Sequence, residues 1–471
     1  MNTAAARPPD DVPGPYPAWL PWAILLAAGA LRLFRLGDWS LWFDEETSIY
    51  FALNPHKPFP RAFPLYFWVL GRVFETAGVS VYSARLISAL AGIATLWLAW
   101  RCIRRFAGDE VALPALVLLV LSPGHLFWSQ SIRYYTLLLV FQIASVHAFL
   151  TALERRSLLW WSLTVGWLVL ALLTNTTAAL LVPVYVIAFA WTLLTRRIAG
   201  RVPWAAILTG LAVVTLASAG LATLVTLRQQ FGDPYEGRVT HLLLRFVGYS
   251  GIPAVGLMLV GLIFTRRAAT DFGFFALLSI VPVLELMLLW TTSLWSIAWY
   301  HGFIAVVGVA AIGGYGWKAL AQRFPRWALV GTGVGVVGAS LAIVVSYFTM
   351  AHGDRPRWDE AAAVLSHHGV GPTATGVDVF SDAPGVIAYY LGVPPGETMG
   401  HPLVRQPPWT GKSGDVSGES WFVVEQRLVP SSWRQRLDRS CESSGVFPGA
   451  MIVRDRTVLV YHCSSKSSQS M

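Results

Sequence analysis

Long apolar stretches recur along the first three quarters of this chain, and they constrain its fold more than any other feature. About eleven are long enough to cross a bilayer, near residues 18–36, 81–100, 110–122, 135–153, 158–174, 177–195, 203–226, 243–265, 272–292, 298–317 and 327–350. Only 13% of all residues are charged, about half of the roughly 25% of a soluble domain. The pattern predicts an α-helical polytopic membrane protein whose membrane domain spans residues 1–350.

Basic residues mark one side of this membrane domain. They cluster in alternate short loops: Arg101, Arg104 and Arg105; Arg155 and Arg156; Arg196, Arg197 and Arg201; Arg266 and Arg267; and Lys318, Arg323 and Arg326. Because loops rich in Lys and Arg stay in the cytoplasm, the N-terminus is expected inside. The first loop (37–80), residues 122–134 and the tail then lie outside. The net charge of +9 follows from these loops and does not indicate a nucleic-acid partner.

The tail from residue 351 to 471 predicts a separate extracytoplasmic α/β domain. Hydropathy falls there, while Gly, Pro and Ser rise. Helices are expected near 358–367, 385–391 and 431–439, strands near 374–380 and 421–425, and a hairpin formed by 451–454 and 457–462. Cys441 and Cys463 would both face an oxidising compartment, but their spacing leaves open whether they form a disulfide.

The first outer loop carries three consecutive acids, Asp44, Glu45 and Glu46, between aromatic residues. Carboxylates beside lipid are costly unless they bind or react with something. A solvated acidic loop, or a helix N-terminus that favours acids, is the alternative. A short interfacial helix is expected near 63–75, with Arg72 and Glu75 as an i,i+3 pair.

A second outer group is Ser-Gln-Ser-Ile-Arg133-Tyr134-Tyr135. Arg133 would lie at the outer end of the fourth span, where its guanidinium could hold a phosphate through two hydrogen bonds. Snorkelling of a span-end arginine toward water is the alternative.

In this order the outer motifs resemble those of the GT-C superfamily of membrane glycosyltransferases. They are Trp-Phe-Asp44-Glu45, then Phe-Pro-Leu-Tyr-Phe-Trp at 63–68, Ser-Ala-Arg85-Leu-Ile-Ser-Ala-Leu, and Ser-Pro-x5-Ser-Gln-Ser-Ile-Arg133-Tyr134-Tyr135. They are most similar to the bacterial branch that includes protein O-mannosyltransferases and the aminoarabinose transferase of lipid A (glycosyltransferase family 39/83-like).

The resemblance implies inverting transfer of a sugar from a polyprenyl-phosphate donor to a glycan, lipid or protein acceptor, outside the inner membrane of a bacterium. Asp44 would be the base, with Glu45 orienting it or holding the acceptor. Arg133 and Tyr134 would bind the donor phosphate. Arg61 would also bind the donor phosphate, although it stands one position nearer the N-terminus than the basic residue of the relatives. The resemblance leaves a divalent metal requirement open, and no metal-ligand motif is present.

Further substrate contacts are expected at Arg85, His301 and Glu285. His301 stands where relatives often have arginine. Glu285 lies within a predicted span, where a carboxylate either serves function or makes a structural bond.

Two other functions remain compatible with the sequence: a transporter or flippase for a lipid-linked glycan, and a glycan polymerase or ligase. Gly333-x-Gly335-x-x-Gly338 matches a dinucleotide-binding pattern, but it lies within a predicted span and no strand precedes it. The spacing of Gly331 and Gly335 instead predicts close packing of two helices.

Overall fold

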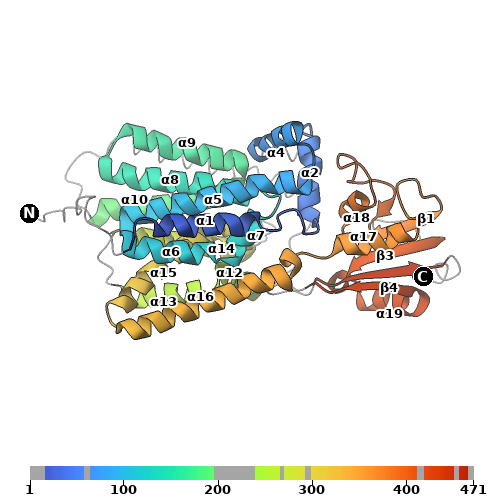
Figure 1. Cartoon of the computed structure of the whole chain (residues 1–471). Helices are drawn as coiled ribbons and strands as arrows, with labels where there is room; N and C mark the ends of the chain where they lie inside the picture. Colours follow the sequence, from blue (N-terminus) through green and yellow to red (C-terminus); the bar gives the residue numbers. More distant parts are fainter. Residues whose placement is uncertain are drawn as a thin grey trace, which may run out of the picture.

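The computed structural model describes residues 16–57, 64–195, 239–265, 270–291, 299–410, 418–449 and 456–464. It consists of a long helical body and a sheet domain at one end of that body (Figure 1). The predicted span at 203–226, Arg61 and two of the basic clusters (Arg196, Arg197 and Arg201; Arg266 and Arg267) lie outside the described residues.

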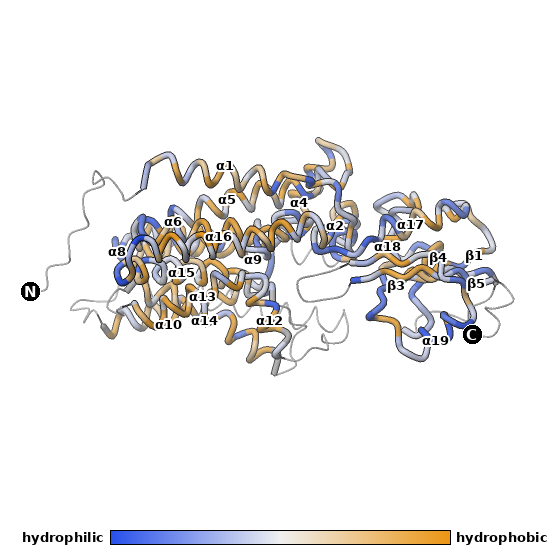
Figure 2. Tube along the Cα trace, turned by 60° about the horizontal axis from the view of Figure 1, so that its bottom comes forward, coloured by the Kyte–Doolittle hydropathy of each residue, from blue (hydrophilic) through white to orange (hydrophobic). Residues whose placement is uncertain are grey.

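The helical body is built almost entirely from apolar helices. Its elements are α1 (Leu20–Leu33), α2 (Phe43–Leu53), α4 (Pro64–Ala77), α5 (Val81–Ala107), α6 (Asp109–Val120), α7 (Pro123–Ser129), α8 (Tyr135–Arg155), α9 (Leu158–Thr174), η1 (Thr176–Leu180), α10 (Leu181–Thr195), α12 (Val239–Ser250), α13 (Ile252–Phe264), α14 (Thr270–Thr291), η2 (Trp299–Gly302), α15 (Ala305–Ala321) and α16 (Arg326–Thr349). In Figure 2 hydrophobic colour predominates along these helices.

Within the described ranges, five helices are long and apolar enough to cross a membrane, and up to seven if each bent pair counts as one span. Three more apolar helices, α1, α9 and α15, are shorter. The predicted multi-pass helical membrane protein is confirmed, whereas the number of eleven spans stays a prediction.

One predicted span is not a single helix. Residues 243–265 form α12 and α13, which bend by 95° at their junction. Gly251 at this junction has a φ of +97°, a conformation that side chains other than glycine adopt only rarely. Pro253 follows in the first turn of α13, where its missing N–H costs no hydrogen bond.

The centre of the body depends on glycines of α15. A Cβ on Gly316 would lie 2.0 Å from the Leu257 oxygen of α13, and one on Gly314 would lie 2.3 Å from the Val111 oxygen of α6. These positions therefore allow backbone-to-backbone packing. The sequence predicted such packing at Gly331 and Gly335. The described part of the chain does not show it, because a Cβ at either position would meet nothing within 4 Å there.

Ion pairs join the predicted cytoplasmic loops at one end of the body. They are Arg104–Asp109 (2.9 Å), Arg105–Glu154 (3.2 Å) and Lys318–Glu110 (2.7 Å). Arg85 lies at the opposite end of α5, about 28 Å from Arg104 at the helical rise per residue. At that opposite end, α2 and α4 lie next to the sheet domain (Figure 1).

The C-terminal domain is α/β, as expected. Its elements are η3 (His352–Asp354), α17 (Trp358–His367), β1 (Val377–Ser381), α18 (Pro384–Tyr390), β2 (Val404–Arg405), η4 (Pro408–Thr410), β3 (Glu419–Glu425), η5 (Gln426–Leu428), α19 (Ser431–Ser440), β4 (Glu442–Phe447) and β5 (Val458–Cys463). The strand order is β2-β1-β3-β5-β4. β1 runs parallel to β2 and β3, and β5 runs antiparallel to β3 and β4. α17 and α19 lie on opposite sides of the sheet (Figure 1).

The strand that pairs with β5 differs from the one that the sequence predicted. The sequence analysis did not predict β4, which pairs with β5. The expected partner of β5, residues 451–454, lies outside the described residues. Cys441, directly after α19, forms a disulfide with Cys463 at the end of β5, with their Cα atoms 4.4 Å apart.

Candidate active site

The candidate site begins at the first turn of α2, which carries Asp44, Glu45 and Glu46. Negative charge is favoured there because the N-terminus of a helix has a partial positive charge. Successive helical residues are rotated by about 100°, so the three carboxylates point in different directions. Each of them consequently meets a different part of the protein.

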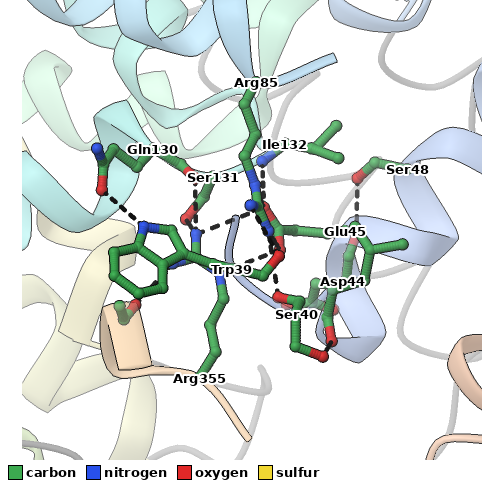
Figure 3. Close-up of polar contacts among 12 residues, drawn as sticks. Trp39, Ser40, Asp44, Glu45, Ser48, Arg85, Gln130, Ser131, Ile132 and Arg355 are labelled. Carbon is green, nitrogen blue, oxygen red and sulfur yellow. Dashed lines mark hydrogen bonds and ion pairs between the residues drawn. The ribbon is translucent and has the colours of Figure 1, made fainter. Parts of the chain in front are cut away.

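Glu45 is fully buried between two arginines (Figure 3). Arg85 of α5 donates to its two carboxylate oxygens at 2.9 and 2.8 Å, and Arg355 donates from the start of the C-terminal domain at 3.2 Å. The Ile132 N–H donates at 2.8 Å. Burial raises the pKa of Glu45, but Arg355, Arg85 and Ile132 outweigh it and lower the pKa to about 2. Such a carboxylate stays ionised and fits an orienting role rather than proton transfer.

Arg85, one of the two arginines that hold Glu45, forms all of its hydrogen bonds within the protein. The five N–H groups of Arg85 bond Glu45 twice and the carbonyls of Leu36, Trp39 and Ser40. With its side chain fully buried, Arg85 has no donor left for a ligand. This geometry favours a structural role for Arg85, and the expected contact with substrate stays a prediction.

Arg355 connects several segments around the site. Its guanidinium donates to the Gln130 backbone oxygen at 2.7 Å and to the Ser131 hydroxyl at 2.9 Å, beside Glu45. The side-chain oxygen of Gln130 accepts from the Trp39 indole at 3.2 Å (Figure 3). The outer segment after α7, the loop before α2 and the C-terminal domain therefore share one buried polar network.

Asp44 is the acid of this turn that remains accessible. Its side chain is 25% exposed, and its Oδ2 lies 3.9 Å from Nη2 of Arg133. Arg133 also donates to the Asp44 carbonyl at 3.4 Å and to the Ser48 hydroxyl at 3.3 Å. The sequence analysis predicted that Asp44 and Arg133 belong to one site, and the structure brings them together.

Arg133 lies among aromatic rings. Its guanidinium carbon is 4.8 Å from the ring centre of Tyr134 and 5.9 Å from that of Tyr135, and Nη2 donates to the Tyr134 hydroxyl at 3.4 Å. The Tyr300 ring of η2 lies 5.1 Å from the Tyr135 ring. The Nε of Arg133 is buried and has no hydrogen-bond partner among the described residues. A guanidinium in this setting can still offer a donor to an anion.

His301 lies at the edge of this aromatic group, because its ring is 4.9 Å from that of Tyr300 on η2. Its role as a substrate contact stays a prediction. Glu285 is on α14, next to Leu286, whose side chain packs against Gly302 of η2. One carboxylate oxygen of Glu285 is buried without a hydrogen-bond partner in the described part of the chain.

Glu46 faces the C-terminal domain. It is 2% exposed, and its Oε1 accepts a hydrogen bond from the Thr398 hydroxyl. Burial raises the pKa of Glu46 to about 7, and the hydrogen bond from Thr398 offsets this effect only in part. The third acid is thus at the junction of the two domains.

The sequence analysis did not single out Arg355, Gln130 or Thr398 as site residues. Arg355 follows the last predicted span by a few residues, in Asp354-Arg355-Pro-Arg357, and its position on the predicted outer face was the available signal. Among the described residues, no group of three or more His, Cys, Asp or Glu side chains is arranged to hold a metal ion.

The chain thus combines a multi-pass helical body, an acidic helix at one end of it and a sheet domain that contacts that helix. The family model of dolichyl-phosphate-mannose-protein mannosyltransferases matches residues 56–218. No curated protein sequence matches the chain.

Solved structures share this fold over nearly the whole chain. ArnT from Cupriavidus metallidurans, bound to undecaprenyl phosphate, matches with a TM-score of 0.53 and 14% identity, over 95% of this chain and 98% of that one. Its apo state gives 0.54 and 13%, over 96% and 99%. The Archaeoglobus fulgidus oligosaccharyltransferase gives 0.53 and 11%, over 95% and 76%. The family model covers about a third of this chain, and the structural matches show that the chain has the fold of these GT-C membrane glycosyltransferases.

Proposed function

We propose that this chain is an inverting glycosyltransferase that moves a sugar from a polyprenyl-phosphate donor to an acceptor outside the inner (plasma) membrane of a bacterium. The sugar is a hexose or a pentose, and the acceptor is a glycan, a lipid or a protein. One observation carries the proposal: the accessible Asp44 carboxylate lies 3.9 Å from the buried Arg133 guanidinium. A base and a cation that binds phosphate are the two groups that this reaction needs side by side.

In the proposed reaction, Asp44 removes the proton of an acceptor hydroxyl. The hydroxyl oxygen then forms a bond to the anomeric carbon of the donor as the bond from that carbon to the phosphate oxygen breaks. The electron pair leaves with the polyprenyl phosphate, and the configuration at the anomeric carbon inverts. Arg133 stabilises the negative charge that develops on the phosphate, and the Tyr134 hydroxyl assists it.

The comparisons support a donor of this kind. The matching family is described by a mannose carried on a dolichyl phosphate, and the ArnT structure contains undecaprenyl phosphate. In both cases the phosphate is attached to a long isoprenoid that stays in the membrane. The end of the helical body that carries Asp44 and Arg133 would face the outside of the cell, with the N-terminus in the cytoplasm.

The test is transfer of a labelled sugar from polyprenyl phosphate by the full-length protein and by Asp44→Asn. This variant keeps the size of the side chain and removes the base, so transfer should fall by about 10²- to 10⁴-fold. Near-normal turnover would contradict the role of Asp44. Movement of intact lipid-linked sugar across vesicles without transfer would indicate a flippase, and use of a lipid diphosphate oligosaccharide would indicate a polymerase or ligase.

A further inference from the structure

The C-terminal domain contacts α2 in its first turn and the residues that flank it at both ends. Before the helix begins, the Leu41 N–H donates to the Tyr390 hydroxyl at 2.7 Å. In the first turn, Glu46 accepts from Thr398. At the other end, the Asn54 amide donates to the Gly396 oxygen at 3.1 Å. These contacts join residues more than 340 positions apart, and they lie at both ends and in the first turn of the helix that carries Asp44.

Glu46 makes the closest of these contacts. A Cβ on Gly385, at the start of α18, would lie 2.5 Å from one carboxylate oxygen of Glu46. No side chain larger than that of glycine fits there unless Glu46 or α18 moves. The same oxygen, Oε2, has no hydrogen-bond partner among the described residues. The fit between Glu46 and α18 is therefore steric, with the Thr398 hydroxyl supplying the hydrogen bond.

Two fixed carboxylates in one helical turn determine the direction of the third. Glu45 is held from one side by Arg85 and Arg355, and Glu46 from another by Thr398 and Gly385. Asp44 precedes both on the same rigid turn. A rotation of this turn would move the Asp44 carboxylate relative to Arg133.

We infer that the C-terminal domain forms part of the active site, and that Thr398 and Gly385 act there as positioning residues for Asp44. By holding Glu46, they set the rotation of the first turn of α2 and thereby the direction of the base. This inference rests on the proposed role of Asp44. It assigns the domain a part in the rate of transfer, in addition to any part in acceptor recognition.

The kinetic experiment uses the full-length protein in lipid nanodiscs, with Thr398→Val, Gly385→Ala and Glu46→Ala. Misplacing a reacting group by about 1 Å can cost about 10²-fold in rate, so kcat should fall by about 10- to 100-fold. KM for the polyprenyl-phosphate sugar should change less than about 2-fold, because Arg133 is not touched. Glu46→Gln should keep nearly normal kcat, since its amide oxygen can accept from Thr398.

Gly371→Ala is the matched control in the same domain, because a Cβ at Gly371 would meet nothing within 4 Å in the described part of the chain. Its kinetics should equal those of the parent protein. Normal kcat in both Thr398→Val and Gly385→Ala would overturn the inference, as would a loss in Glu46→Ala that Glu46→Gln shares in full. If Gly385→Ala fails to fold, Thr398→Val, which removes a single hydroxyl, decides alone.

A second readout does not depend on catalysis. Asp44→Cys is labelled with a maleimide, with and without Thr398→Val, and the native Cys102 is buried. A several-fold change in labelling rate supports positioning, and equal rates overturn it. If the parent protein transfers no sugar, the proposed function fails while the labelling result still decides the positioning role.

Discussion

At the scale of single residues, Asp44 and Glu45 carry the same functional group but have different surroundings. Glu45 is fully buried between two guanidinium groups, whereas a quarter of the Asp44 side chain is exposed. A neighbouring cation stabilises the ionised form of a carboxylate, and more so when water is excluded. The proposed proton transfer is therefore assigned to Asp44, and the role proposed for Glu45 is to fix the turn that carries Asp44.

Replacing Glu45 by glutamine should affect stability first. The substitution leaves Arg85 and Arg355 buried without their anion, and breaking a buried ion pair in this way costs about 3–5 kcal/mol. Thermal unfolding of purified Glu45→Gln should show a large loss of stability. Asp44→Asn should unfold close to the parent temperature, because Asp44 is partly exposed and makes one long ion pair. Equal melting temperatures for all three proteins would contradict the structural role of Glu45.

Arg133 should matter for transfer through its geometry as well as its charge. Arg133→Gln removes the cation and should lower kcat/KM by about 10²- to 10³-fold, the usual loss for one group that stabilises developing charge. Arg133→Lys keeps the charge but lacks the planar fork, so an intermediate loss is expected. Arg72→Gln is the control, because Arg72 is exposed and its contacts are with Glu75 and the Trp68 ring, away from Asp44 and Arg133. Similar kinetics for Arg133→Gln and Arg72→Gln would refute the phosphate role.

The sequence could indicate these residues but not the distant partners that hold them in place. Three adjacent acids at a predicted interface predict a site, and the ordered outer motifs added Arg133. The partner that fixes Glu45 in place is Arg355, 310 positions away. No local pattern in a single sequence reports such a contact, so the sequence left open whether Glu45 orients Asp44 or holds the acceptor.

At the scale of elements, helix limits followed from local signals, whereas packing faces did not. The helices at 158–174 and 358–367 end where apolar periodicity and polar flanks predict. The break between α12 and α13 depends on Gly251 and Pro253 inside an otherwise continuous apolar run. Mean hydropathy over a span-length window does not detect such a break, so the sequence predicted a single span. Gly331 and Gly335 have the spacing of a packing motif, but α16 turns them away from the described helices.

Glycine substitutions can test which helix forms the centre of the body. Gly316→Ala places a Cβ 2.0 Å from a backbone oxygen of α13, so the two helices must separate, at an expected cost of about 1–3 kcal/mol. Gly331→Ala adds the same methyl group where the described structure leaves space and should not lower stability. Thermal unfolding in the same detergent compares the two. A loss in Gly331→Ala that equals the loss in Gly316→Ala would mean that α16 has a packing partner in the native protein.

At the scale of the whole molecule, charge and hydropathy predicted the two parts, and the fold confirms a helical membrane body with a small sheet domain. Their docking could not be predicted, because it depends on contacts across most of the chain, such as Asn54 with Gly396 and Glu46 with Thr398. The docked domain contacts the helix that carries Asp44, the proposed base. In this chain the candidate site therefore includes residues that follow α16, such as Arg355 and Thr398.

Docking should weaken as pH rises, because it buries Glu46. The pKa of Glu46 is raised by burial to about 7, against an ordinary value of 4.5. A carboxyl group whose pKa is raised by folding contributes its full stability below the ordinary pKa and loses it as pH rises through the folded value. The stability from Glu46 should thus decline between about pH 4.5 and 7 and be absent above that range.

Glu46→Gln isolates this contribution, because it cannot ionise while all other groups remain. Asp382, whose pKa burial also raises to about 7, is present in both proteins and cancels in the comparison. Melting temperatures measured from pH 5 to 8 should fall more steeply for the parent protein than for Glu46→Gln. If docking positions Asp44, kcat should also fall more steeply with rising pH in the parent protein than in Glu46→Gln. Parallel pH profiles for the two proteins would show that Glu46 is ionised in the docked state, and that its junction with Thr398 is held by a charged rather than a neutral carboxyl group.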